Sequence, residues 1–376
     1  MKKYLSLIIL IVLVSCTKAD VHVFAGQSNM TGYGKVEELT LDDLDNTGIY
    51  GWDWRENKWV HDPSPLEHKD VFFADRYLGY NVHKNNVTFG VELHALRTIR
   101  KKTGKDQYFV KLAIGGSSLQ QWEDIHYQEL STELNTALGF KKVDAFYWMQ
   151  GETDAINLDT AETYEARLSN FVSRVREDYG NVRFIAGMIA DREIVRSDGT
   201  IGPRWNYAKT VRKALWDMNK ASVISIVGTD DLSVYNGPDN DVNGFNTAHY
   251  DGRSIKLLGK KFAISYLYFG NTNTYPELLG DFNKDDDLDI LASKPVREEK
   301  HFSIMSMNRD YSVTGQYFLH WKTNVFNRIP NRFNFVSVVD ADNDGDYDIG
   351  HTDGTGMWIW RIEGDQIVAS QWHEDK

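Results

Sequence analysis

The chain has 376 residues, and its 42 Lys and Arg against 54 Asp and Glu give a formal net charge of −12. Its 41% hydrophobic and 26% charged residues exclude a disordered or collagen-like chain, and its length allows two domains. The acidic balance argues against nucleic acid as the principal partner, because that binding depends on clustered Lys and Arg, and a single cysteine excludes an intrachain disulfide.

The first residues have the pattern of an export signal. Two lysines precede an uncharged run from residue 4 to 14, which is too short to span a bilayer comfortably, and Cys16 follows closely. This resembles a bacterial lipoprotein signal, in which cleavage leaves Cys16 N-terminal and lipidated. We therefore expect a signal peptide at 1–15, a tether at 16–20 and an exported lipoprotein anchored to a membrane of the cell envelope. The alternative is an ordinary secretory signal.

Residues 21–269 are predicted to alternate strands and helices. Helical patterns run from Tyr164 to Tyr179, with Asp159 and Glu162 as a capping start and Gly180 as the stop, and from about 252 to 268. Apolar runs typical of buried strands lie at 21–25, 108–114, 145–149, 184–189 and 223–227. This alternation predicts an α/β fold with a parallel sheet, which binds ligands at the carboxyl ends of its strands.

Four polar or glycine-rich loops follow predicted strands or precede the last helix. They are GQSNM at 26–30, GGSSL at 115–119, QGETD at 150–154 and NTAHY at 246–250. A serine in a tight strand-to-helix turn suits a nucleophile, because its hydroxyl is exposed and backbone N–H groups face the developing oxyanion. Each loop taken singly is more typical of a helix cap, so it is their order that indicates catalysis.

That order is the block arrangement of SGNH hydrolases, and the loops resemble those of the sialate O-acetylesterase-like enzymes of carbohydrate esterase family 6. The matching segments are GQSNM, GGSSLQQW, QGETD and the stretch around His249, so the resemblance spans residues 21 to about 268. It implies a flavodoxin-like three-layer sandwich with a parallel sheet. It also implies hydrolysis of acetyl esters on sialic acid or polysaccharide without a catalytic cofactor.

The resemblance implies a role for each matching residue. Ser28 would be the nucleophile and His249 the general base. The oxyanion hole would consist of the backbone N–H groups of Ser28 and Gly116 and the side-chain amide of Gln150. An acetylated carbohydrate would be the partner in the site, and no protein partner is identified.

The third position of a catalytic triad departs from the family pattern. Where these hydrolases carry an acid three residues before the histidine, this chain has Asn246, which gives a forming imidazolium no counter-charge. A carboxylate could reach His249 from another loop, from Asp241, Asp251, Glu152 or Asp154. Loop support is otherwise the expected role of Glu152 and Asp154.

Two rival hypotheses therefore remain. The first is a surface glycan-binding protein on a catalytically decayed esterase scaffold. The second is a lipid or aryl esterase of the same superfamily. Four tryptophans in predicted loops could stack on sugars or pack the loops: Trp52, Trp54, Trp59 and Trp122.

Residues 270–376 contain two acidic loops with the same spacing of oxygen side chains. Their members are Asp281, Asn283, Asp285, Asp287 and Asp289 in the first loop, and Asp340, Asp342, Asp344, Asp346 and Asp348 in the second. Oxygen donors two residues apart are typical of Ca²⁺ loops, and both loops resemble the FG-GAP repeats of β-propellers. Short strands are predicted at 302–307, 316–322, 333–339, 357–362 and 367–372. We expect a small all-β module with structural Ca²⁺; the alternative is a pair of acidic surface turns.

Overall fold

The structure is a computed structural model. It describes residues 19–61, 80–83, 86–139, 142–195, 199–229, 232–237 and 245–269, and eight strands between residues 275 and 374. The expected signal peptide and Cys16 lie outside these residues, as do Asp241 and residues 281–288 and 340–347 of the acidic loops. The first strand begins at Asp20, one residue before the expected start of the first domain.

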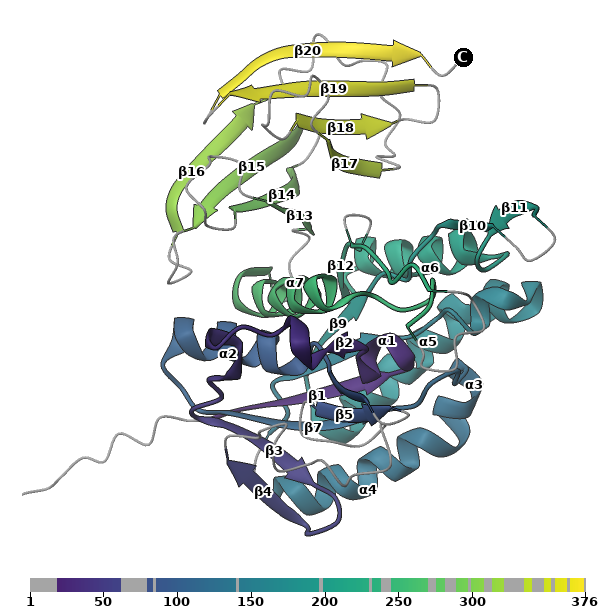
Figure 1. Cartoon of the computed structure of the whole chain (residues 1–376), viewed down its shortest axis with the longest axis vertical. Helices are drawn as coiled ribbons and strands as arrows, with labels where there is room; N and C mark the ends of the chain where they lie inside the picture. Colours follow the sequence, from purple (N-terminus) through teal and green to yellow (C-terminus); the bar gives the residue numbers. More distant parts are fainter. Residues whose placement is uncertain are drawn as a thin grey trace, which may run out of the picture.

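A seven-stranded sheet forms the centre of the first domain, in the order β12-β9-β8-β1-β7-β3-β4 (Figure 1). Neighbouring strands are parallel except β3 and β4, which form an antiparallel hairpin at the edge. The strands are β1 (Asp20–Gly26), β3 (Ile49–Asp53), β4 (Lys58–His61), β7 (Gln107–Ala113), β8 (Ala145–Met149), β9 (Arg183–Gly187) and β12 (Ser225–Val227). The prediction of an α/β fold with a mainly parallel sheet is confirmed.

Within the part of the chain that the structure describes, seven α-helices connect or flank these strands. They are α1 (Ser28–Thr31), α2 (Glu92–Thr103), α3 (Leu119–Gln121), α4 (Tyr127–Leu138), α5 (Leu158–Tyr179), α6 (Ala208–Lys220) and α7 (Gly252–Ile264). Short 3₁₀ turns lie at Val36–Glu38, Asp42–Leu44 and Asp154–Ile156, and π turns at Trp122–His126 and Ser265–Phe269. Among the helices that the structure describes, none is long and apolar enough to cross a bilayer.

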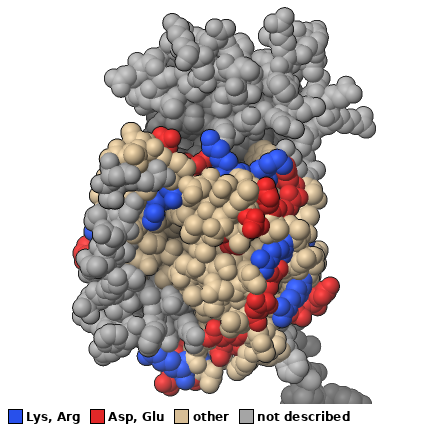
Figure 2. Space-filling model, turned by 90° about the vertical axis from the view of Figure 1, so that its right-hand side faces the viewer, with Lys and Arg blue, Asp and Glu red and all other residues tan. Residues whose placement is uncertain are grey.

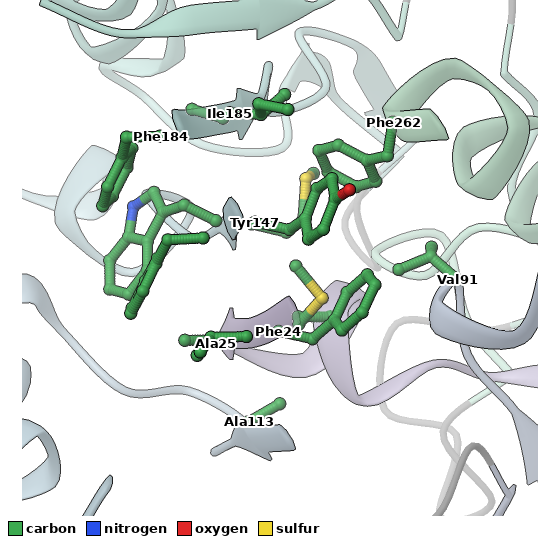
Figure 3. Packing of buried hydrophobic residues seen from close by; sticks show 14 of the residues in the cluster. Phe24, Ala25, Val91, Ala113, Tyr147, Phe184, Ile185 and Phe262 are labelled. Atoms are coloured by element: carbon green, nitrogen blue, oxygen red, sulfur yellow. The ribbon is translucent and has the colours of Figure 1, made fainter. Parts of the chain in front are cut away.

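Strand β8 shows how the three layers are assembled. All five of its residues are buried, as expected for a central parallel strand covered on both faces. Tyr147 points to the face covered by α7, where its ring meets Phe262 at 5.4 Å and stacks on Phe24 at 4.5 Å (Figure 3). Trp148, the next residue, points to the opposite face and meets Phe171 of α5 at 5.0 Å. The sheet is therefore covered by helices on both faces.

The two helices predicted individually are present, with one correction. The apolar stripes of α5 and α7 are buried, and Gly180 ends α5, donating its N–H to Arg176 O at 2.9 Å. The predicted capping start at Asp159 is wrong, because α5 begins at Leu158 and the residue in the N-cap position is Asn157, without a side-chain capping bond.

Smaller sheets flank the central one. One contains β2 (Gly34–Lys35), β6 (Asn86–Phe89) and β5 (Tyr80–His83), and a hairpin pairs β10 (Glu193–Val195) with β11 (Ile201–Pro203).

The C-terminal strands form two antiparallel sheets of four strands each. The first contains β13 (Tyr275–Gly280), β14 (Asp289–Val296), β15 (Glu299–Met307) and β16 (Val313–His320). The second contains β17 (Phe335–Val339), β18 (Asp348–Thr352), β19 (Gly356–Glu363) and β20 (Gln366–Glu374). In both sheets an acidic loop joins the first strand to the second, with Gly280 paired to Asp289 and Val339 paired to Asp348.

Candidate active site

Three of the four predicted loops meet because their strands are neighbours. Strand β1 lies between β7 and β8, and its last residue, Gly26, pairs with Ala113 on one side and Met149 on the other. The segments that follow these residues, with Ser28, the glycine loop and Gln150, therefore leave the sheet at the same carboxyl edge.

Ser28 begins α1 directly after a sharp turn. Gly26 has φ +149°, and a Cβ on it would lie 2.1 Å from Met149 O, so only glycine fits against β8 at this point. Gly115 lies beside Ser28, since a Cβ on Gly115 would meet Ser28 Cβ at 3.8 Å. Gly115 and Gly116 are exposed. The serine thus faces a glycine loop with open backbone.

Gln150 is fully buried, and its side-chain amide is engaged within the protein. Its Nε2 donates to Asp154 Oδ2 at 2.5 Å and to Ser117 O at 3.1 Å. An amide nitrogen carries two hydrogens, so these bonds leave none for an oxyanion. In this structure the Gln150 amide joins the glycine loop to Asp154, and its expected role in the oxyanion hole stays a prediction.

Asp154 connects two loops. Its Oδ2 also accepts the Leu119 N–H at 2.9 Å, at the start of α3. Burial raises the pKa of Asp154, and the hydrogen bond from Gln150 opposes that rise. Its contacts are therefore with the loops and not with the His249 turn.

Asn29 links the serine turn to the His249 turn. Its Nδ2 donates to Glu152 Oε1 at 2.7 Å and to Ala248 O at 3.1 Å, and its Oδ1 accepts the Tyr250 N–H at 3.2 Å. The last two groups flank His249 on both sides. A buried amide next to Ser28 therefore holds the backbone on either side of His249.

Glu152 is buried behind Asn29. Burial raises the pKa of its carboxyl group, which the Asn29 hydrogen bond opposes. Its second oxygen, Oε2, has no hydrogen-bond partner. A protonated Glu152 fits this setting better than a carboxylate, because an unpaired buried charge is costly.

His249 lies in the turn that leads into α7. The ring of Tyr33 stacks on the imidazole with 3.8 Å between ring centroids and 9° between ring planes. The Tyr235 N–H donates to His249 O, and the His249 N–H to Asn246 O, both at 3.1 Å. The base is thus positioned by an aromatic face and by its backbone.

The possible partners for the His249 imidazole have other contacts. Asn246 is buried, and its Oδ1 accepts the Ala248 N–H at 3.0 Å, which closes the turn. Asp251 caps α7 by accepting the Ser254 N–H at 2.8 Å. Glu152 reaches the His249 turn through Asn29.

A buried ion pair supports α1. Lys111 on β7 places its Nζ 2.6 Å from Glu92 Oε1 and 2.8 Å from the carbonyl oxygen of Thr31, the last residue of α1. Both charged side chains are fully inaccessible. Burial raises the pKa of Glu92, and the nearby Lys111 ammonium opposes that rise. This pair ties the nucleophile helix to β7 and α2.

The tryptophans differ in exposure. Trp122 is fully buried and donates Nε1–H to Ser117 Oγ at 3.0 Å, and buried Trp52 donates to Glu133 Oε2 at 3.1 Å. These two pack the fold and cannot stack on a sugar in this structure. Trp59 is half-buried and meets Trp52 edge-on.

Comparison with known proteins identifies the family of the first domain. Residues 18–268 match the family described as carbohydrate esterase, sialic acid-specific acetylesterase. The chain belongs to this family. A search of curated protein sequences finds no match to this chain.

Solved structures are similar to this carbohydrate esterase domain, and the first one named here shares its fold. A protein from Arabidopsis thaliana is 18% identical with a TM-score of 0.51, over 67% of this chain and 99% of that chain. NanS is 16% identical with a TM-score of 0.46, over 67% of this chain and 98% of that chain. Axe2, an acetylxylan esterase from Geobacillus stearothermophilus, is 11% identical with a TM-score of 0.36, over 68% of this chain and 98% of that chain.

The face of the esterase domain that carries α1 and α3 is largely uncharged. Figure 2 views the molecule from this side, and in its described part Lys, Arg, Asp and Glu lie interspersed around a broad uncharged area. Within the described residues, no three His, Cys, Asp or Glu side chains are grouped so that they could hold a metal ion.

Proposed function

We propose that the protein is an acetylesterase that removes O-acetyl groups from carbohydrate, with Ser28 as nucleophile and His249 as general base. The observation that carries this proposal is the Asn29 link, which fixes the backbone on both sides of His249 from the residue next to Ser28. The family of the chain supplies the substrate class.

The proposed reaction has two stages. Ser28 Oγ attacks the acetyl carbonyl while its proton passes to His249, and the carbonyl oxygen becomes an oxyanion. The backbone N–H groups of Ser28 and Gly116 stabilise that oxyanion. The imidazolium then gives its proton to the sugar oxygen as the C–O bond breaks. Water releases acetate from Ser28 by the same steps in reverse order.

A panel of esters tests the proposal. Acetate release is measured from acetylated sialic acid, acetylated xylan and p-nitrophenyl acetate, and compared with release of longer acyl chains. We expect acetyl sugars to be preferred and activity to be lost in Ser28→Ala and His249→Ala. Ser173→Ala, an exposed serine on α5, is the matched control and stays active. Equal activity of Ser28→Ala and wild type on every ester would exclude the mechanism.

A second candidate function rests on Asn246. A chain without a triad carboxylate could bind glycans on a decayed scaffold, and the same panel separates the two functions. Absence of Ser28-dependent acetate release, together with binding of acetylated glycans, would favour the binding protein.

We propose export and lipidation from the N-terminal sequence alone. Lipid on Cys16 would hold the protein at a membrane surface without a spanning segment. Cys16→Ala is expected to move the protein from the membrane fraction to the soluble fraction, whereas an unchanged distribution would contradict lipidation.

We propose structural Ca²⁺ in the two acidic loops. Each loop joins two paired antiparallel strands at the same position of its sheet, which supports a repeated binding unit. Asp281 and Asp340 would begin the two ligand sets, with Ca²⁺ offsetting the repulsion between the clustered carboxylates.

A further inference from the structure

We propose that Tyr33 is a positioning residue for His249, and that its ring face sets the plane of the imidazole and stabilises its protonated form. This inference rests on the proposed function, because it assigns a role in the Ser28–His249 reaction. It begins from the stacked rings, whose centroids are 3.8 Å apart and whose planes differ by 9°.

The place of Tyr33 is fixed by its surroundings. Gly32 has φ +91°, and a Cβ on it would lie 2.2 Å from Gly90 Cα, so the chain turns here in close contact with a neighbouring segment. The Tyr235 hydroxyl lies 3.1 Å from Tyr33 O, and the Phe245 ring meets the Tyr33 ring edge-on at 6.4 Å. Only 8% of Tyr33 is exposed. The Tyr33 ring is therefore held in place, and the His249 imidazole lies against its face.

The stacked ring constrains the orientation of the His249 imidazole, which contacts to the backbone cannot do. The Asn29 bonds fix the main chain at residues 248 and 250, but main-chain bonds do not by themselves set the plane of the imidazole. A parallel ring at contact distance selects one ring plane. That plane determines where the nitrogen that takes the Ser28 proton can lie.

The same contact favours the charged form that arises during the reaction. When His249 takes the proton from Ser28, the imidazole becomes a cation, and aromatic faces attract cations within about 6 Å of their centroid. The attraction is stronger in the transition state than in the free enzyme, so it increases kcat rather than substrate binding.

Three substitutions distinguish the contribution of the Tyr33 ring face from that of its hydroxyl and from a general loss of stability. Tyr33→Phe keeps the face and removes the hydroxyl, whereas Tyr33→Leu removes the face. Tyr50→Leu is the matched control, since Tyr50 stacks on Tyr108 at 4.4 Å and 6°, at the amino end of β7. We expect Tyr33→Leu to lower kcat by roughly 10-fold with KM little changed, and Tyr33→Phe to keep most of the rate.

A fluorophosphonate probe makes the test independent of the substrate class. Ser28 Oγ forms a bond to phosphorus, fluoride leaves, and the proton passes to His249, so the labelling rate reports the Ser–His pair itself. Labelling of the wild type without acetate release from any sugar would reject the proposed substrate, and the Tyr33 comparison would still be measured.

NMR signals of the His249 ring protons give a third readout that needs no reaction. The Tyr33 ring current shifts them in the wild type and in Tyr33→Phe, and we expect this shift to disappear in Tyr33→Leu. Either of two results overturns the proposal: Tyr33→Leu with wild-type labelling and wild-type His249 signals, or Tyr33→Phe as impaired as Tyr33→Leu.

Discussion

Asn29 uses its whole side chain to connect the nucleophile turn with the base. Its amide hydrogens go to Glu152 and Ala248 O, and its oxygen accepts from Tyr250 N–H. None of these partners is close in sequence, since Ala248 is 219 positions away. The position of the Ser28 turn relative to the His249 turn thus depends on one buried amide.

Replacement of this amide by a carboxylate should separate the two turns. In Asn29→Asp, a carboxylate oxygen would face Glu152 Oε1 and Ala248 O, where Nδ2 now donates. Leaving buried groups without a hydrogen bond costs about 1–3 kcal/mol each, so we expect kcat to fall roughly 10- to 100-fold. Steady-state kinetics on p-nitrophenyl acetate measure this, with Asn170→Asp on the exposed face of α5 as control. An unchanged kcat would show that the Asn29 bonds do not hold His249.

The buried Glu152 carboxyl group should make the stability of the folded protein depend on pH. Burial raises its pKa in the folded protein above the unfolded value of about 4.3. The folded state therefore holds the proton more tightly. Stability from this group is complete below the unfolded pKa and is lost as pH rises through the folded pKa.

Glu152→Gln removes this titration while it keeps an acceptor for Asn29. We expect its Tm to equal that of the wild type near the unfolded pKa of about 4.3 and to exceed it increasingly as the pH rises above that value. Thermal unfolding at a series of pH values measures the difference, with the exposed Glu162→Gln as control. A Tm difference that does not change with pH would mean that Glu152 does not titrate in this range.

At the scale of elements, α1 is held between two strands and a buried charge. The Lys111 ammonium bonds both the Glu92 carboxylate and the last carbonyl of α1. Removing one member of a buried pair leaves an uncompensated charge, and such changes cost about 3–5 kcal/mol.

Lys111→Met should therefore strongly lower the free energy of unfolding. We expect a loss of about 3–5 kcal/mol, part of which is recovered when Glu92→Met is added, because the second change removes the unpaired carboxylate. Urea unfolding measures both variants against Lys209→Met, an exposed lysine on α6. A double variant less stable than Lys111→Met alone would contradict the ion-pair account.

The sequence predicted the central strands and failed on other elements for physical reasons. The central parallel strands are continuous apolar runs because both of their faces are buried, as in β8. Helix α2 buries Glu92, His94 and Thr98, so its inner face lacks a clear apolar stripe. Edge strands such as β4 contain no fully buried residue and therefore give a weak pattern.

The candidate site could be predicted only in part. Ser28, His249 and the glycine loop were indicated by the order of their motifs. Asn29 lies inside a quoted motif, but its role required knowledge of which strands are neighbours. Nothing in the sequence indicated the Tyr33–His249 contact. The bonds of Gln150 to Asp154 and Ser117 could not be predicted, because they depend on how the loops fold.

At the scale of the whole molecule, the two C-terminal sheets repeat one arrangement, with an acidic loop after the first strand of each. Calcium that binds the folded loops more tightly than the unfolded chain must stabilise the folded state. We therefore expect excess EDTA to lower the Tm of the full chain and added Ca²⁺ to restore it. Mg²⁺ at the same concentration should restore less, because it requires a tighter octahedral shell. An EDTA-treated protein with unchanged Tm would reject structural calcium.

The mechanism at Ser28 has the most direct test in its covalent intermediate. Reaction with an acetylated sugar is stopped with acid during turnover, and the peptides are examined by mass spectrometry. The account predicts one acetyl group on the peptide that carries Ser28, and neither adduct nor acetate release in Ser28→Ala. Acetate release that continues in Ser28→Ala, or turnover with the acetyl group found on another residue, would contradict it.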